Sequence, residues 1–514
     1  MERKTKRRRQ AEATRPNATA SSSSGSRTST ETDSDRAVDT PRRRSGSRPV
    51  DDAPKQRKRE LPSPKKRQQQ QQRRRSTSQT AVGVEAKAYF HGYLTRELVE
   101  QMLQKPGDYL LRKRLGEDDA RDDGDYVLTA MSEQRRPVHT LLEKNDAGLW
   151  QLTDYSDPTI DGLIDRIQRD RARLECGEGD LLLRHAVRRQ AWEITHGQLE
   201  LGRVLGEGAF GKVVRGALKP PSGSGGEALQ VAVKVSNTKK LTRKELDDVL
   251  TEAFTMASFK HDNVVRFLGV AVERQPIMLI MELVNGGSLD ELLRREAARR
   301  RPFSLDKKCL FLQQAACGIH YLHSHNCIHR DIAARNCLVE QLTDRQGQMQ
   351  YKVKITDFGM ARTVSRKGIY RTMGSSLRAP LKWLPPESLR ELVFTRTSDV
   401  WSFGVLAWEI FADGGEPYSQ EDVEAIKDSV ENGYRLSCPE GTPSPVDRLM
   451  RRCWHGEAER RPTFDRILPY LETLKQRGWP TDRQVDLERC LLNPPRPLPP
   501  PAIQPRNRPV INFI

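Results

Sequence analysis

Residues 329–336 read His-Arg-Asp-Ile-Ala-Ala-Arg-Asn, and residues 357–359 read Asp-Phe-Gly. Together these two stretches hold the residue types that transfer of a phosphoryl group requires. The carboxylate of Asp331 suits the acceptance of a proton from a hydroxyl group, and the side chains of Asn336 and Asp357 offer oxygen ligands to a magnesium ion. The sequence therefore predicts a phosphoryl-transfer site, and we expect its ATP-binding parts elsewhere in the chain.

A glycine-rich segment at residues 206–213, Gly-Glu-Gly-Ala-Phe-Gly-Lys-Val, supplies the upstream half of such a site. Its spacing alone is weak, because the same pattern occurs in dinucleotide-binding folds, where a helix follows the loop. Here residues 213–216 continue with strand-forming residues, so we expect a hairpin whose glycines let the backbone lie close to phosphates.

The strand and the helix after this loop supply a predicted ion pair. Residues 231–235 alternate as Val-Ala-Val-Lys-Val, which places Ala232 and Lys234 on one face. A small residue there leaves room for a flat base, and the lysine beside it can reach phosphates. A capping box that begins at Thr242 starts a helical pattern, and Glu252 on this helix is the natural partner of Lys234.

With these parts in this order, residues 199–474 resemble the catalytic domain of a protein kinase. The resemblance implies a two-lobed fold, with ATP as phosphate donor and with Mg²⁺, or Mn²⁺ as an alternative, as the metal. It implies catalytic roles for Asp331, Arg335, Asn336, Lys234 and Glu252, metal binding by Asn336 and Asp357, and ATP binding by Leu205, Gly206, Glu207, Gly208, Ala209, Phe210, Gly211, Lys212, Val213, Ala232, Lys234, Met281, Glu282 and Leu283. It also implies a structural ion pair between Glu387 and Arg461.

The hydroxyl that is attacked is predicted to be that of tyrosine. Kinases that act on serine or threonine carry a lysine two residues after the catalytic aspartate, where this chain has Ala333. Arg335 instead follows four residues after Asp331, as in tyrosine kinases. The segment 380–383, Pro-Leu-Lys-Trp, resembles the platform that supports a bulky aromatic substrate. A serine/threonine kinase with altered motifs is the alternative.

Tyr370 lies between the Asp-Phe-Gly motif and Glu387, in the predicted activation segment. Phosphorylation would add about −1.5 to −2 charges beside basic residues. Arg330, next to the catalytic aspartate, is the expected clamp for that phosphate. We therefore expect phosphorylation of Tyr370 in trans to order the segment, with a surface tyrosine of no special role as the alternative.

A second region, residues 89–183, has its own pattern. The apolar strand at 107–112 ends in Arg112, and a buried arginine is costly unless it is paired. A guanidinium group can bind phosphate bidentately. Together with further strands, this region resembles a Src-homology-2 (SH2) domain, which binds phosphotyrosine peptides through Arg112, assisted by Arg96 and His139. The resemblance implies a central antiparallel sheet flanked by two helices.

The expected phosphate pocket departs from the SH2 pattern in two places. Lys113 and Arg114 stand where the family often has Glu-Ser, so a hydroxyl is lost. Residues 117–123 form an acidic loop that would repel an anionic peptide if it folds near the pocket.

An SH2 domain followed by a linker at 184–198 and a kinase domain is similar to the Fes/Fer group of non-receptor tyrosine kinases, without their F-BAR region. The expected class is thus α+β over residues 89–474. The group implies that the SH2 domain packs on the small kinase lobe and supports activity. A phosphotyrosine-binding adaptor with a non-catalytic kinase fold is the alternative, which the set of catalytic residues disfavours.

The two ends of the chain are predicted to be disordered. The first 80 residues contain 23 Lys and Arg but only 9 Asp and Glu, and so hold most of the net charge of +18. The predicted tail, residues 1–85, could bind anionic lipid, bind nucleic acid or direct the chain to the nucleus, or be only a solvated tail. The tail at 475–514 is rich in proline and could dock an SH3 domain.

The sequence has no long apolar run and no signal peptide, so no transmembrane segment is expected. Eight scattered cysteines indicate reduced thiols rather than disulfides or structural zinc. The expected location is the cytoplasm, with the inner membrane surface and the nucleus as alternatives. The predicted partners are tyrosines of substrate proteins and phosphotyrosine peptides.

Overall fold

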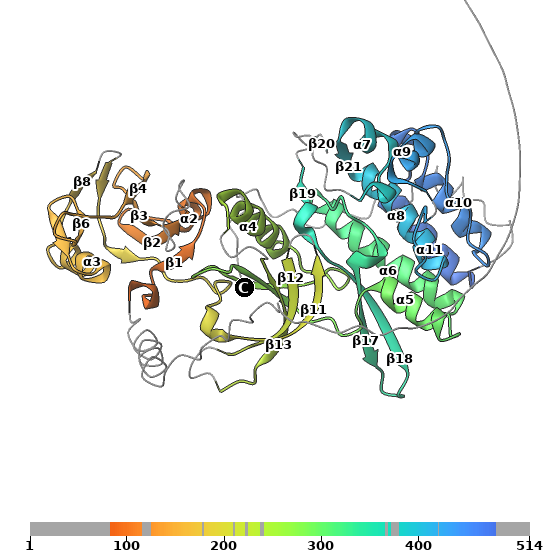
Figure 1. Ribbon diagram of the computed structural model, residues 1–514, viewed down its shortest axis with the longest axis horizontal. Helices are drawn as coiled ribbons and strands as arrows, with labels where there is room; N and C mark the ends of the chain where they lie inside the picture. The colour runs from red at the N-terminus through yellow and green to blue at the C-terminus, as the bar shows by residue number, and fades with distance from the viewer. Residues whose placement is uncertain are drawn as a thin grey trace, which may run out of the picture. The chain divides into compact units, whose positions relative to one another are not determined.

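The computed structural model describes residues 83–115, 125–176, 179–208, 211–220, 225–236, 241–364, 369–371, 380–419 and 421–479 (Figure 1). The basic tail before these ranges, the acidic loop and nearly all of the proline-rich tail lie outside them, so predictions about those segments stay predictions. No helix within the described ranges has the length and apolar character that a membrane crossing needs.

The N-terminal region is built around a sheet whose central strands β2, β3 and β4 pair antiparallel, as expected. Strands β1 and β10 both pair parallel with β2, so the complete sheet is mixed. Helix α2 packs on one face of the sheet and helix α3 on the other. The elements are η1 (Val84–Ala86), β1 (Phe90–Tyr93), α2 (Arg96–Met102), β2 (Asp108–Arg114), β3 (Asp125–Met131), β4 (Pro137–Leu141), β5 (Glu143–Lys144), β6 (Trp150–Leu152), β7 (Tyr155–Asp157), α3 (Ile160–Arg169), β8 (Leu174–Cys176), β9 (Gly179–Leu181) and β10 (His185–Ala186).

The alternation of side chains along β2 separates two apolar clusters. Tyr109 and Leu111 pack into the cluster that contains α3, whereas Leu110 packs with α2. Arg112 therefore shares the α2 face with Leu110, because side chains two residues apart lie on the same face of a strand. Lys113 points to the opposite face, where its ammonium group lies 2.6 Å from Glu85.

The small lobe of the kinase domain is a five-stranded sheet with one long helix. The strand order is β11-β12-β13-β15-β14, and all pairs are antiparallel. The predicted capping box is present, since Glu245 N–H donates to Thr242 Oγ1 at 3.2 Å and Thr242 N–H donates to Glu245 Oε2 at 2.8 Å. The elements are η2 (His196–Gln198), β11 (Leu199–Gly208), β12 (Gly211–Leu218), β13 (Leu229–Val235), α4 (Arg243–Ala257), β14 (Phe267–Ala271) and β15 (Met278–Glu282).

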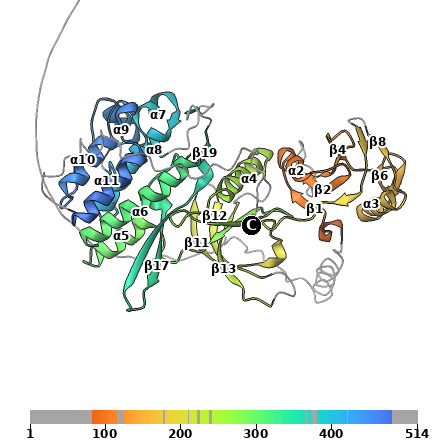
Figure 2. The same cartoon turned by 180° about the vertical axis from the view of Figure 1, so that it is seen from behind.

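The large lobe is mainly helical, and α6 packs against α8 and α11 in its core (Figure 2). Its helices are α5 (Leu289–Ala298), α6 (Leu305–Ser324), α7 (Pro386–Glu391), α8 (Arg396–Phe411), α9 (Val423–Glu431), α10 (Ser444–Cys453) and α11 (Phe464–Gln476), with short turns η3 (Ala334–Asn336), η4 (Phe358–Met360), η5 (Leu381–Trp383) and η6 (Ala458–Arg460). Its strands are β16 (Cys327–Ile328), β17 (Cys337–Thr343), β18 (Met349–Ile355), β19 (Arg362–Thr363), β20 (Ile369–Arg371) and β21 (Val393–Thr395).

The polar stretch from residue 341 to 351 forms the tip of a hairpin, in which β17 and β18 stay paired as far as Thr343 and Met349. The Asp344 carboxylate closes the turn by accepting the N–H groups of Gln346 and Gln348. One turn-forming aspartate thus extends the hairpin well into the polar stretch.

One apolar cluster joins the N-terminal region to the kinase domain. Leu94, Leu98 and Val99 belong to the same buried cluster as Leu246 and Leu250 of α4. This contact was an expectation drawn from the Fes/Fer resemblance, and the packing confirms it.

Two polar contacts lie at or next to this junction. The N–H of Tyr93 donates to Val272 O at 2.8 Å, and His91 Nδ1 pairs with Glu193 at 2.8 Å. At Gly92 the two backbones come so close that an added Cβ would lie 2.1 Å from Val272 O, so only glycine fits there.

The seven described cysteines form no disulfide. Several are buried in the large lobe, and burial raises the pKa of the Cys309 and Cys327 thiols to about 12. A thiol with such a high pKa stays protonated at neutral pH and is inert. Cys309, Cys327, Cys337 and Cys453 are buried core residues, whereas Cys176, Cys317 and Cys438 are half-buried.

Candidate active site

A lysine contacted by two carboxylates forms the centre of the site. Lys234 on β13 donates to Glu252 Oε1 on α4 at 2.7 Å and to Asp357 Oδ1 at 3.0 Å. Burial alone would lower the pKa of Lys234, but the charges of Glu252 and Asp357 raise it above its ordinary value. The lysine is therefore held as a cation, and the predicted ion pair is present.

The position of Asp357 depends on packing of the next residue. Phe358 is fully buried, and its ring lies against Phe259 and His329 with centroids 5.6 and 5.2 Å apart. Asp357 itself has a left-handed backbone conformation, with φ of 61°. A buried phenylalanine on one side of this turn keeps the aspartate on the lysine side.

A buried aspartate holds the backbone of the catalytic loop through hydrogen bonds. Asp399 of α8 accepts the N–H groups of His329 and Arg330 at 2.8 and 2.9 Å, and also a hydrogen bond from His323 at 2.9 Å. Burial alone would raise the pKa of Asp399, but these hydrogen bonds lower it below its ordinary value. The carboxylate therefore stays charged and holds Arg330 in a left-handed conformation, with φ of 71°.

Asp331 and Asn336 lie side by side in this loop. The Asn336 amide donates to the Asp331 carbonyl at 2.8 Å, which fixes the spacing of the two residues. Arg335 forms a short hydrogen bond with the Asp331 carboxylate. The fold thus brings Asp331, Arg335 and Asn336, all predicted to act at one site, into direct contact.

A network that the sequence did not predict supports Arg335. Its guanidinium group lies 4.3 Å from the ring centre of Trp383, and the indole N–H of Trp383 donates to Glu409 at 3.0 Å. Glu409 also accepts the Ala334 N–H at 2.9 Å. Burial raises the pKa of Glu409 to about 7. The available signal was a carboxylate within the apolar C-terminal half of α8.

The predicted nucleotide-binding residues line the sheet next to this centre. Gly206 pairs with Val213 and Gly208 with Gly211, so the glycine-rich segment is the expected hairpin. Ala232 of β13 pairs with Met281 of β15. The remaining predicted residues are placed as follows: Leu205 and Glu207 lie in β11, Lys212 in β12, Glu282 at the end of β15, and Leu283 directly after it, whereas Ala209 and Phe210 lie outside the described residues.

Among the described residues, no three His, Cys, Asp or Glu side chains gather in a way that could hold a metal ion. Asn336 and Asp357 offer only two ligands. This fits a magnesium ion, which is commonly held by one or two protein oxygens together with substrate phosphates.

The activation segment contacts the catalytic loop through Tyr370 on β20. The Arg330 guanidinium lies 4.6 Å from the ring centre of Tyr370 and 4.2 Å from that of Phe394. The predicted clamp and the predicted modification site are therefore neighbours. The expected ion pair between Glu387 and Arg461 is also present, at 2.6 and 2.8 Å.

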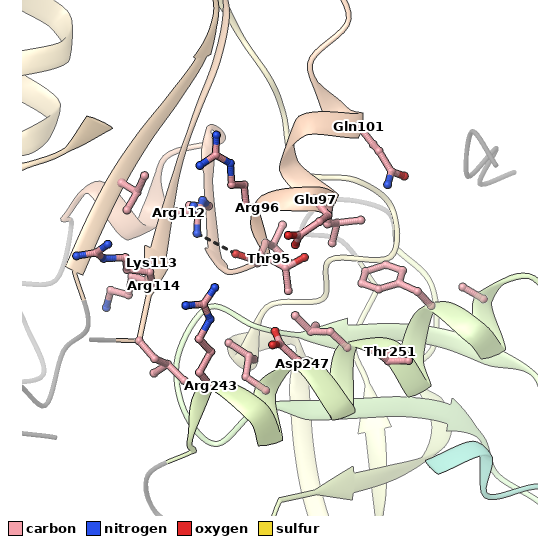
Figure 3. A pocket seen from close by; sticks show the side chains of 18 of the residues that line it. Thr95, Arg96, Glu97, Gln101, Arg112, Lys113, Arg114, Arg243, Asp247 and Thr251 are labelled. Atoms are coloured by element: carbon pink, nitrogen blue, oxygen red, sulfur yellow. Dashed lines mark hydrogen bonds between the residues drawn. The ribbon is translucent and has the colours of Figure 1, made fainter. Parts of the chain in front are cut away.

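The predicted phosphotyrosine residues surround one pocket of the N-terminal region (Figure 3). Arg112 lies on β2 and donates to Leu94 O at 3.2 Å. Arg96 and His139 both pair with Glu100, at 2.9 and 3.0 Å. The structure brings all three predicted residues together. Lys113 adds no free charge to the pocket, because it pairs with Glu85.

Comparison with known proteins identifies the family. Residues 199–471 match the family described as protein tyrosine and serine/threonine kinases. The tyrosine-protein kinase transforming protein Fps of Fujinami sarcoma virus is 35% identical over 392 residues, which are 76% of this chain and 42% of that protein. Fer-related kinase 1 of Caenorhabditis elegans is 34% identical over 391 residues, which are 75% of this chain and 93% of the worm protein. The chain belongs to the Fps/Fes/Fer family of tyrosine kinases.

Human tyrosine-protein kinase Fer is a further member of the Fps/Fes/Fer family, at 34% identity over 390 residues, which are 76% of this chain and 44% of Fer. The chain thus spans less than half the length of the Fujinami and human relatives but nearly all of the worm relative. A kinase domain of this family implies ATP and a divalent metal. The β-rich small lobe and helical large lobe agree with the predicted fold class.

Proposed function

We propose that this chain is an active protein-tyrosine kinase that transfers the γ-phosphate of ATP to tyrosine hydroxyls of proteins. The observation that carries the proposal is the simultaneous contact of Lys234 with Glu252 and Asp357. This contact places the lysine that would hold the nucleotide phosphates beside the carboxylate that would hold the metal. A buried ion pair contributes little net stability, so the presence of this charged cluster in the interior favours a functional role.

The ATP site lies under the β11–β12 hairpin in this proposal. Ala232 and Met281 would face the adenine, Glu282 and Leu283 its polar edge, and the hairpin glycines the phosphates. Asn336 and Asp357 would hold Mg²⁺ or Mn²⁺. Bound Mg-ATP supplies the phosphoryl group, and the metal offsets the charge of its phosphates.

Asp331 acts as the base that accepts the proton of the substrate tyrosine. Its carboxylate is held by Arg335, whose guanidinium is itself held against Trp383. Arg335 thereby brings a positive charge to the side of the catalytic loop where a phenol oxygen would approach. Trp383 would offer an aromatic surface beside Arg335 for the ring of a substrate tyrosine, which favours tyrosine over the shorter serine side chain.

The N-terminal region binds phosphotyrosine peptides through Arg112, with Arg96 and His139 in support. This binding would guide the kinase to phosphorylated partners. The proline-rich tail would bind SH3 domains, and the basic tail would bind anionic lipids or nucleic acid. The proposed location is the cytoplasm, with the membrane surface or the nucleus reached through the basic tail.

Incubation of the full chain with Mg-ATP and a pool of tyrosine, serine and threonine peptides tests the proposal. Mass spectrometry should find phosphotyrosine, and Asp331→Asn should reduce its formation by roughly 10²–10⁴-fold because the general base is lost. Absence of phosphate transfer by a folded, ATP-binding protein would favour the adaptor function instead. Phosphoserine as the main product would overturn the assignment to tyrosine.

A further inference from the structure

A cavity of about 1320 Å³ lies where the phosphate pocket of the N-terminal region faces helix α4. Residues from α2 and β2 line it on one side, and residues of α4 line it on the other (Figure 3). The guanidinium groups labelled in Figure 3 come from both sides, since Arg96, Arg112 and Arg114 belong to the N-terminal region and Arg243 belongs to α4. The kinase domain therefore contributes a cation to the wall of this pocket.

Arg112 is incompletely satisfied in this arrangement. Its side chain is only 8% exposed, and its buried Nε has no hydrogen-bond partner among the described residues. Burial, and then repulsion by Arg114 and Arg96, lowers the pKa of Arg112 to about 10; Glu97 opposes this fall and Arg243 adds to it. An unpaired buried guanidinium is costly unless a ligand supplies the missing acceptor. The pocket is thus prepared for an anion.

The cations around Arg112 differ in how they are paired. Arg96 pairs with Glu100, and Arg114 pairs with Asp125 at 3.2 Å. Arg243 makes no ion pair within 4 Å of a described carboxylate, although its charge acts on Asp247, one turn further along α4. Among the four arginines that line the pocket, Arg112 and Arg243 are therefore the two that form no close ion pair with a described residue.

The start of α4 is an unfavourable place for the positive charge of Arg243. This arginine is the first residue of α4, where a positive charge opposes the helix dipole. The capping box of this helix uses Thr242 and Glu245 and leaves Arg243 without a part in it. Two carboxylates, Glu97 and Asp247, also line the pocket, and in Figure 3 they lie on the other side of Arg243 from Arg114. Glu97 acts electrostatically on Arg112 and Asp247 on Arg243, so they offset part of the positive charge.

We propose that Arg243 of the kinase domain completes the phosphotyrosine site of the N-terminal region, so that one phosphate is bound by Arg112 and Arg243 together. The inference rests on the proposed phosphotyrosine binding by Arg112. In this arrangement the guanidinium group of Arg243 takes the place of the serine hydroxyl that SH2 domains often have at the position of Arg114. Because α4 also carries Glu252, a bound phosphopeptide would contact the helix that positions Lys234.

Binding of a fluorescein-labelled pool of phosphotyrosine pentapeptides to the full chain tests this proposal. The Asp331→Asn background keeps the protein unphosphorylated during the measurement. Arg112→Ala should remove measurable binding. Arg243→Gln should weaken binding roughly tenfold, as expected for loss of a charge-assisted hydrogen bond. Lys244→Gln is the matched control, because Lys244 is the next residue of α4 and does not line the pocket.

The outcomes separate the two proposals. Loss of binding in Arg112→Ala with full binding by Arg243→Gln would leave the phosphotyrosine site standing and overturn the role of Arg243. Equal binding by Arg112→Ala and the parent protein would overturn both. Arg243→Glu should bind more weakly than Arg243→Gln, and equal affinities of Arg243→Glu and Lys244→Gln would also refute the inference. Circular dichroism before each titration shows that α4 and the sheets are intact.

Discussion

At the scale of single residues, Glu409 is a buried carboxylate whose titration falls near neutral pH. Burial raises its pKa to about 7 from an ordinary value of 4.5, with Asp290 adding to the rise and Arg335 opposing it. Between these two values the folded chain holds a proton that the unfolded chain has lost. The resulting contribution to stability is fully present below about pH 4.5 and is lost as the pH rises through 7.

Glu409→Gln should therefore make the free energy of unfolding less dependent on pH. Glutamine keeps an oxygen for the N–H groups of Trp383 and Ala334 but cannot ionise. The difference in the free energy of unfolding between parent and variant should change by up to roughly 3 kcal/mol between about pH 4.5 and pH 7 or above. Urea unfolding of both proteins at about pH 5 and about pH 8 measures it. If the free energy of unfolding falls by the same amount from about pH 5 to about pH 8 in both proteins, the raised pKa of Glu409 is contradicted.

At the scale of elements, strand β20 holds Tyr370 against Arg330. Tyr370→Phe keeps an aromatic ring beside the guanidinium but removes the hydroxyl that accepts phosphate. After dephosphorylation and incubation with Mg-ATP, we expect kcat/KM of the variant to be roughly tenfold below that of the parent, because the ion pair with Arg330 cannot form.

Initial rates on a tyrosine peptide measure this effect. Tyr434→Phe serves as the control, because Tyr434 is an exposed tyrosine outside the activation segment. Equal rates for Tyr370→Phe and the parent would show that Tyr370 does not regulate the kinase.

The elements also show what the sequence could and could not predict. Lys234, Glu252 and Asp331 were predictable because their chemistry depends on residue type at a fixed spacing within or between regular elements. Glu409 and Arg243 were not, because their roles depend on which distant side chains the fold places beside them. Arg243 has the appearance of a surface residue at the start of a helix, and only the fold shows that it lines the same pocket as Arg112.

At the scale of the whole molecule, the described part of the N-terminal region and the kinase domain share an apolar cluster, so we expect them to unfold together. Gly92→Ala should disturb this junction, because its Cβ would lie 2.1 Å from Val272 O and its φ of +64° strains an alanine. We expect the melting temperature to fall by about 2–4 °C or more, or the transition to split.

Differential scanning calorimetry checks this expectation. Gly197→Ala is the control, since a Cβ at Gly197 meets no atom within 4 Å. Identical melting curves for the two alanine variants would show that the junction contributes little to the stability of the whole.

The buried thiols of the large lobe offer a way to observe the molecule without a label. Cys309 and Cys327 are fully buried, and their high pKa keeps them unreactive while the lobe is closed. An alkylating reagent such as iodoacetamide can modify them only after the surrounding helices separate. The rate of their alkylation therefore reports the rate of spontaneous opening around the catalytic loop. Comparison of the alkylation rates with and without nucleotide would show how much a bound ligand slows this opening.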